Sequence, residues 1–312
     1  NLEMPASGGF NNKKIVDAVK KGTLSESKLD EIVIETLAIT LKAKDSHQQG
    51  IVVDKAKHHT LAREASGESI VLLKNSNSIL PLKASAKKVA IIGAFAKKPR
   101  YQGAGSSQVK PTQVENAFDE LQKLAKGTTF SYAEGYTSAG DTNATLLNEA
   151  VKNAKGAETV LLFAGLPDVY ESEGYDRANM DLPAGHNQLI EAIAKVNKNV
   201  VVILLNGSAV STSWKKEVAA IVEAYLGGQA GGGAIADVLT GKVNPSGKLS
   251  ETFPMRLEDT PTAIDFPSKD GVANYGEGIF IGYRYYDKKK IEPNFPFGFG
   301  LSYTTFSYSD IK

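Results

Sequence analysis

The sequence contains no cysteine among its 312 residues. Disulfide bonds, thiolate metal sites and cysteine nucleophiles are therefore excluded, and a cytoplasmic location fits this composition. The chain also has almost no net charge, because 36 Lys and Arg are matched by 35 Asp and Glu. Without a strong field of one sign, neither nucleic acid nor an anionic membrane surface is indicated as a partner.

Long apolar runs are absent as well. A clean run such as 200–205 is far shorter than the roughly 18 residues that a membrane-spanning helix requires. No secretory signal segment opens the sequence. Because it also lacks an initiator methionine, we expect it to begin inside a longer protein. A hydrophobic content of 42% and a charged content of 23% are ordinary for a globular chain of about two domains.

From residue 87 onward, short apolar runs alternate with stretches at helical spacing. The expected strands are 89–92, 129–132, 159–164, 200–205 and 219–225, and the expected helices are 114–125, 146–154, 185–196 and 230–239. This alternation predicts an α/β fold, a mainly parallel open sheet covered by helices on both faces. Loops at the carboxyl ends of such strands share one edge, where ligands bind.

The sequence before residue 87 indicates smaller pieces. Residues 1–45 are expected to form the end of a strand and then helices, in a piece too small for a core of its own. A connecting helix is expected at 54–73, within a linker region 46–86. His58 and His59 do not suggest a metal site, because adjacent helical residues point in different directions. No metal or other cofactor is expected.

Two polar loops and a glycine-rich turn are expected at the ligand-binding edge. In 99–111, glycines allow close backbone approach, and Ser106 and its neighbours offer hydrogen bonds suited to hydroxyl groups. A plain turn over the sheet is the alternative there, while a nucleotide site is disfavoured because no phosphate-binding signature is present. Asn206–Ser208 form the second loop. The turn 227–233 fits either an anion at a helix N-terminus or close helix packing.

An acidic loop, 165–177, follows the third expected strand. It carries Glu171 and Glu173 between Tyr170 and Tyr175. Because the carboxylates repel each other and the tyrosines can exclude water, one carboxyl group could keep its proton near neutral pH, as a general acid must. The alternative is a solvated acidic loop without catalytic function.

The order of motifs along the chain resembles the C-terminal part of the family 3 glycoside hydrolases, and is most similar to β-glucosidases. The matching segments are 2–5, 68–75 with 80–82, 101–107, 171–177, 244–249, 282–286 and 297–303. The resemblance implies a (β/α) barrel ending at about residue 45, a linker at 46–86, and an α/β sandwich domain at 87–250. An extended segment, 251–312, would lead toward a fibronectin-like domain.

The resemblance also implies a division of catalytic work. The barrel would supply an aspartate nucleophile, whose motif lies before the segment matching 2–5, and the sandwich domain the general acid/base. Glu173 matches the acid/base position, with Glu171 as runner-up, and Ser106 matches a sugar-binding position. The expected function is retaining hydrolysis of terminal β-D-glucosyl residues from a β-glucoside or oligosaccharide. The isolated chain would be inactive without a barrel segment or partner chain.

Other functions remain open on sequence grounds. A non-catalytic sugar-binding or interaction domain could derive from the same family, and β-xylosidases carry a similar acidic loop. An unrelated flavodoxin-like nucleotide binder would have the same alternation of strands and helices, although it would need a phosphate signature. A homo-oligomer is also left open.

Overall fold

The structure is a computed structural model that describes residues 2–4 and 6–310. The chain divides by its contacts into two compact units, with the boundary between Asp54 and Lys55. Within the described ranges, no helix combines the length and the apolarity needed to cross a membrane.

The first unit consists of two helices, α1 (Asn12–Lys20) and α2 (Glu26–Asp45). The Ser25 side chain caps α2 by accepting a hydrogen bond from the Lys28 amide. Both expected helices are confirmed, and neither has a buried residue. The expected strand end at 2–5 is not formed by residues 2–4, because an isolated extended segment has no neighbouring strand to pair with. Its Pro5 lies outside the described residues.

The second unit contains a sheet of six strands in the order β1-β6-β5-β4-β2-β3. The strands are β1 (Val71–Asn75), β2 (Lys88–Ile92), β3 (Thr129–Ala133), β4 (Thr159–Gly165), β5 (Val200–Leu205) and β6 (Ala220–Glu223). Strands β2 to β6 are parallel, and β1 pairs with β6 in the antiparallel sense. Every residue of β4 and β5 is buried, as central strands covered on both faces require.

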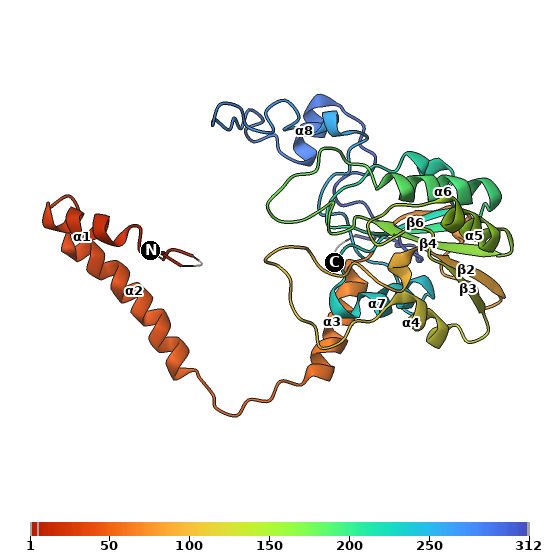
Figure 1. The fold of residues 1–312 in the computed structure, drawn as a ribbon, viewed down its shortest axis with the longest axis horizontal. Helices are drawn as coiled ribbons and strands as arrows, with labels where there is room; N and C mark the ends of the chain where they lie inside the picture. The colour runs from red at the N-terminus through yellow and green to blue at the C-terminus, as the bar shows by residue number, and fades with distance from the viewer. Residues whose placement is uncertain (1, 5, 311–312) are drawn as a thin grey trace. The chain divides into compact units, whose positions relative to one another are not determined.

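Helices cover both faces of this sheet (Figure 1). On one face α3 (Lys55–Ser69), α4 (Ala117–Leu124) and α7 (Gly231–Leu239) pack together, and on the other α5 (Ala144–Lys155) packs on α6 (Ala184–Val196). The mainly parallel α/β architecture expected from the alternation is therefore confirmed. The five expected strands and four expected helices are all present, with ends displaced by no more than a few residues.

Strand β1 is the main difference from the sequence expectation. The helix predicted at 54–73 ends at Ser69, and Val71–Asn75 form the antiparallel edge strand instead. A short apolar run is compatible with either a buried strand or a buried helix, so periodicity alone could not decide. Pairing with β6 decides it, because Val71, Leu72 and Leu73 are then buried in the core. Residues 55–75 thus belong to the compact unit that contains the sheet.

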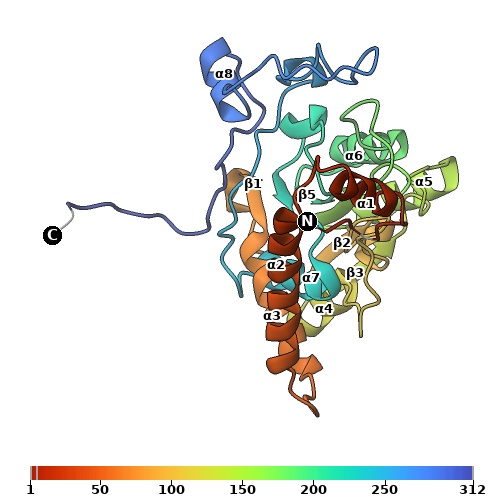
Figure 2. The same ribbon diagram turned by 90° about the vertical axis from the view of Figure 1, so that its left-hand side faces the viewer.

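The C-terminal part of the chain, from residue 251 onward, consists mainly of turns and irregular backbone. The Phe253 and Leu301 backbones form isolated bridges with Phe295 and Leu72, respectively. A short helix that the sequence analysis did not anticipate, α8 (Tyr283–Lys289), interrupts this segment. Beyond Tyr303 the chain leaves the sheet and its described residues are exposed (Figure 2).

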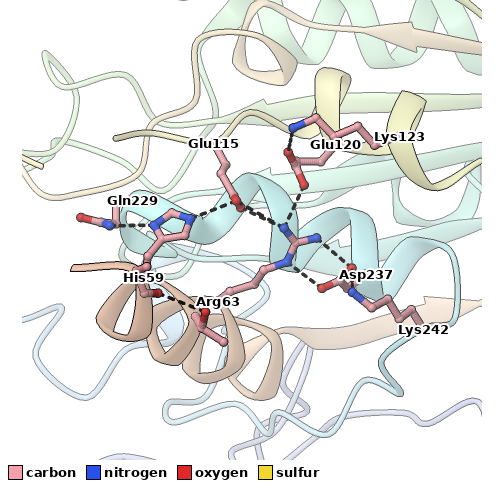
Figure 3. A network of polar contacts seen from close by, with 10 residues as sticks. His59, Arg63, Glu115, Glu120, Lys123, Gln229, Asp237 and Lys242 are labelled. Atoms are coloured by element: carbon pink, nitrogen blue, oxygen red, sulfur yellow. Dashed lines mark hydrogen bonds and ion pairs between the residues drawn. The ribbon is translucent and has the colours of Figure 1, made fainter. Parts of the chain in front are cut away.

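One guanidinium group joins the three helices α3, α4 and α7 (Figure 3). Arg63 on α3 makes a bidentate contact with Asp237 on α7, through Nε at 2.8 Å and Nη2 at 2.9 Å. Its Nη1 donates to Glu120 on α4 at 2.8 Å. A Cβ at Gly233 would lie 2.3 Å from this Nη1, so the glycine-rich turn permits close packing. The carboxylates raise the pKa of Arg63 above its already high value.

The two adjacent histidines have different environments. His59 is buried, and its Nε2 and Nδ1 lie 2.9 Å from Glu115 and 2.7 Å from Gln229, in the same polar network (Figure 3). His58 is exposed. His59 thus has a structural role in joining α3 to the segments before α4 and α7.

We predict that Arg63→Met destabilises the second unit. The substitution removes the guanidinium group that Asp237 and Glu120 share and leaves each of these buried carboxylates with only an exposed lysine. Loss of one partner of a buried ion pair costs about 3 kcal/mol or more. Urea unfolding followed by the fluorescence of Trp214, the single tryptophan, would measure the loss. Arg256→Met, which removes an exposed partner of Asp259, is the control and should change little. Equal stability of the two variants would contradict the prediction.

Candidate functional site

The order of the strands places two of the three predicted loops beside each other. Strand β2 pairs with β3 on one side and with β4 on the other, so the chain reverses its direction across the sheet between β2 and β4. Ligands in open parallel sheets bind outside the carboxyl ends of the strands at such a switch point. The loop after β2 carries Ser106, and the loop after β4 carries Glu173.

Ser106 and Glu173 are in direct contact. The Ser106 amide donates to Glu173 Oε2 at 2.8 Å, and the Ser106 hydroxyl donates to the same oxygen. Gly105 makes this approach possible: its φ is +86°, and a Cβ there would lie 2.7 Å from the Cβ of Glu173. The structure therefore brings together the predicted acid/base and the predicted sugar-binding residue, and both are exposed to solvent.

The protonation state expected for the acidic loop is wrong for Glu173 in this chain. Its two hydrogen bonds from Ser106 favour the carboxylate and lower its pKa below the ordinary value. Nor does Tyr175 exclude water: it is 49% exposed, and its hydroxyl donates to the Asp168 carbonyl at 2.9 Å. Tyr170 instead packs against the hydrophobic core. Glu173 is therefore a solvent-exposed carboxylate at the edge of the sheet where the strands have their carboxyl ends.

Glu171 has a different environment from Glu173. Its Oε2 accepts from Arg100 Nη1 and from the Gly207 amide, both at 2.8 Å, and its Oε1 accepts from the Ser208 hydroxyl. Arg100 Nη2 also donates to the Glu171 carbonyl at 2.8 Å. The Arg100 side chain is only 3% exposed. Because both carboxylate oxygens are occupied, Glu171 is suited to anchoring its loop rather than to transferring a proton.

Arg100 and Asn206–Ser208 thus connect all three loops. Arg100 lies in the loop after β2, Glu171 in the loop after β4, and Gly207 and Ser208 in the loop after β5. The sequence analysis grouped these loops at one edge but did not single out Arg100. A lone arginine between two glycine-containing segments gives no spacing signal, because its partner lies 71 residues away.

Two further acidic residues, Glu223 and Glu251, lie near Glu171. Glu223, the last residue of β6, is fully buried, and burial raises its pKa to about 8. Burial also raises the pKa of Glu251, which accepts a hydrogen bond from the Ala209 amide at 3.1 Å. Arg177 donates through Nη2 to the Ala209 carbonyl at 2.9 Å. Sequence reasoning missed Glu223, although an acidic residue inside the apolar run 219–225 was the available signal.

The described residues contain no group of three or more His, Asp or Glu side chains arranged to hold a metal ion. The functional groups at this edge are carboxylates, hydroxyls and backbone amides. Glu173 can exchange a proton with a bound molecule, and Ser106 can donate a hydrogen bond to it or accept one from it.

Comparisons with known proteins place these residues in a family context. Residues 70–303 match the description "Glycosyl hydrolase family 3 C-terminal domain". Thermostable beta-glucosidase B of Acetivibrio thermocellus is 52% identical, and the match covers all of this chain and 42% of that protein. An exo-alpha-(1->6)-L-arabinopyranosidase of Bifidobacterium longum is 41% identical with the same coverage of each chain.

Solved structures agree with this relationship. The crystal structure of a Bifidobacterium adolescentis GH3 beta-glucosidase superimposes with a TM-score of 0.90 at 44% identity. The superposition covers 97% of this chain and 44% of that one. The chain therefore spans less than half the length of each of these three relatives.

Ser106→Ala is expected to raise the pKa of Glu173. The substitution removes the hydroxyl that makes the largest contribution to stabilising the carboxylate, while the backbone amide remains. Carboxyl carbon chemical shifts followed by NMR against pH would report the change directly. Ser107→Ala, which removes a hydroxyl that contacts the Ala104 carbonyl instead, is the matched control. An unchanged Glu173 titration in Ser106→Ala would contradict the contact.

A further prediction concerns stability against pH. Glu223 has a folded-state pKa of about 8, above its ordinary value of 4.5, so its contribution is fully present below 4.5 and is lost as the pH rises through 8. We expect the unfolding free energy of the second unit to fall over this window by up to roughly 5 kcal/mol, at 1.36 kcal/mol per pKa unit. Glu223→Gln should flatten the profile, as measured by Trp214 fluorescence. A slope parallel to that of the unmodified chain would refute this.

Proposed function

The chain belongs to glycoside hydrolase family 3, of which it carries the C-terminal domain, and from this premise we propose that it supplies the general acid/base of a retaining, exo-acting β-glucosidase. The observation that carries the proposal is the contact between Glu173 and Ser106 at the switch point of the sheet. Glu173 is the better candidate than Glu171, because both oxygens of Glu171 are held by Arg100 and the 207–208 backbone and hydroxyl.

The proposed reaction is a double displacement. Glu173 protonates the departing glycosidic oxygen while an aspartate, expected on a barrel segment outside this sequence, attacks the sugar and forms a glycosyl-enzyme. Glu173 then takes a proton from the water that hydrolyses this intermediate. The two carboxyl groups must lie about 5 to 5.5 Å apart for this outcome.

The low pKa of Glu173 in this chain is compatible with that role if the site changes on assembly. A sugar hydroxyl that replaces Glu173 as the partner of the Ser106 hydroxyl would remove the main interaction that lowers the pKa. A barrel segment that covers the exposed carboxyl group of Glu173 would also remove water from it, and desolvation raises the pKa of a carboxyl group. Binding of substrate between the two domains would thereby create the proton donor.

The similar proteins point to two candidate sugars. A β-glucoside is favoured by the 52% identity with a β-glucosidase across the whole chain. The arabinopyranosidase of Bifidobacterium longum matches the same residues at 41% identity, so a pentopyranoside is the second candidate. A β-xyloside belongs to the same chemical class, since both pentopyranoses lack the hydroxymethyl group of glucose. A sugar-binding domain without catalysis would keep Ser106 but would not need Glu173.

The test uses a chimera in which this chain replaces the matching part of thermostable beta-glucosidase B. We expect it to hydrolyse an aryl β-glucoside, and Glu173→Gln to lower kcat/KM by about 10²- to 10⁴-fold, the usual contribution of a general acid/base. Glu149→Gln, on the exposed face of α5, is the matched control and should retain activity.

Two results would overturn parts of the proposal. A chimera that is active but insensitive to Glu173→Gln would remove Glu173 from the mechanism. Turnover by the 312-residue chain alone, abolished by Glu173→Gln, would show that no separate nucleophile segment is needed. Binding of glucose by the chain, with an inactive but folded chimera, would favour the sugar-binding function.

A further inference from the structure

Glu223 is an ionisable group buried where no cation reaches it. It ends β6 opposite Leu204 of β5 and Val71 of β1, and it is 0% exposed. Its Oε2 accepts a hydrogen bond from Asn206 Nδ2 at 3.1 Å, and its Oε1 accepts one from the Tyr225 amide at 3.1 Å. None of the ion pairs found among the described residues includes it. An ionised carboxylate in such a position is strongly disfavoured.

The groups around Glu223 make the charged form still less favourable. Glu171, from the loop after β4, and Glu251, from the segment after α7, both add negative charge nearby and raise the pKa of Glu223. Tyr225, two residues beyond the end of β6, donates to Glu223 through its backbone amide. Within the described residues its buried hydroxyl has no hydrogen-bond partner, and burial together with Glu223 raises the pKa of Tyr225. Of the two neighbouring arginines, Arg100 binds Glu171, and Arg177 donates through Nη2 to the Ser208 hydroxyl and the Ala209 carbonyl while its buried Nη1 has no hydrogen-bond partner in the described part of the chain. Neither arginine forms an ion pair with Glu223 among the described residues. Glu223 is therefore uncharged at neutral pH.

Hydrogen bonds connect Glu223 with the candidate acid/base loop. The same Asn206 Nδ2 that contacts Glu223 donates to the Ser208 carbonyl at 3.0 Å and so closes the turn after β5. This turn presents the Gly207 amide and the Ser208 hydroxyl to Glu171. Glu223 is thus linked to Glu171 by a series of hydrogen bonds through Asn206, Gly207 and Ser208.

Glu171 is connected to Glu173 through the backbone of the same loop. Glu171 is two residues before Glu173, and the Glu171 carbonyl is also fixed by Arg100. A shift of the 206–208 turn would therefore move the loop that places Glu173 beside Ser106. No contact in this series depends on substrate.

We propose that Glu223 is a positioning residue: its carboxyl group, acting through Asn206 and the 206–208 turn, holds Glu171 and so fixes the loop that presents Glu173. The proposal rests on the function proposed above, since a loop without chemistry would need no such support. Glu223 touches neither substrate nor Glu173, and it acts only through the turn.

The arrangement also makes the loop sensitive to alkaline pH. In the folded chain Glu223 is protonated below about pH 8 and ionised above it. Ionisation places a third negative charge beside Glu171 and Glu251, which repels Glu171 from the turn. The turn and its amide contacts should therefore loosen as the pH rises through 8.

NMR on the 312-residue chain tests this without any measurement of hydrolysis. We expect the Gly207 amide signal to shift with a midpoint near pH 8, with the Ser106 amide following. After correction for intrinsic exchange, hydrogen-exchange protection of Gly207 should fall by roughly tenfold between about pH 7 and about pH 9. Glu223→Gln, which has the shape of the neutral acid but cannot ionise, should abolish the transition near pH 8, although its amide group keeps only one of the two accepting oxygens.

The controls separate positioning from general stability. Glu158→Gln alters a carboxyl group at the opposite edge of the sheet, where it accepts from the Lys87 amide, and should leave the Gly207 transition unchanged. Glu223→Ala, where it folds, should displace the Gly207 and Ser106 signals at every pH. If it does not fold, the Glu223→Gln profile decides alone.

Two outcomes would overturn the inference. One is a Gly207 transition in Glu223→Gln that matches the unmodified chain. The other is a folded Glu223→Ala chain whose Gly207 and Ser106 signals do not move. Neither result bears on the Glu173→Gln chimera, so failure here is distinguishable from failure of the proposed function.

Discussion

The buried contact between Arg100 and Glu171 is the interaction on which the candidate site depends. It joins the loop after β2 to the loop after β4, and Glu171 in turn binds the turn after β5. An arginine that is 3% exposed cannot be left without a carboxylate at acceptable cost, so the three loops are held together as a unit. The site is therefore a rigid edge of the sheet, with Glu173 and Ser106 at its outer rim.

This constraint explains why two carboxylates two residues apart have different roles. Glu171 accepts hydrogen bonds from Arg100, the Gly207 amide and the Ser208 hydroxyl. Glu173 accepts hydrogen bonds from Ser106 and remains exposed. The first fixes the backbone, and the second stays available for a ligand. The buried acid Glu223 also supports this loop, because its uncharged carboxyl group binds Asn206 in the 206–208 turn without repelling Glu171.

The sequence predicted much of the fold because its signals are local. The buried runs that became β4 and β5 are apolar on both faces and are bounded by turns, so a central parallel strand was the natural interpretation. Strand β1 was missed because Val71–Leu73 follow a helix without a turn signal, and only pairing with β6 distinguishes a strand from a helix there. The loop protonation was misjudged for the same reason, since exposure of Tyr175 is not a local property.

The sequence by itself determined the alternation of strands and helices from β2 to α7, the family resemblance, and the placement of a serine loop and an acidic loop at one edge of the sheet, because these depend on periodicity and on residue identity. Only the tertiary structure decided that Arg100 binds Glu171, that Glu173 rather than Glu171 stays free, and that Glu223 is buried beneath them. These properties arise from contacts between residues far apart in the chain, and they set the burial and the charge environment that govern each carboxyl group.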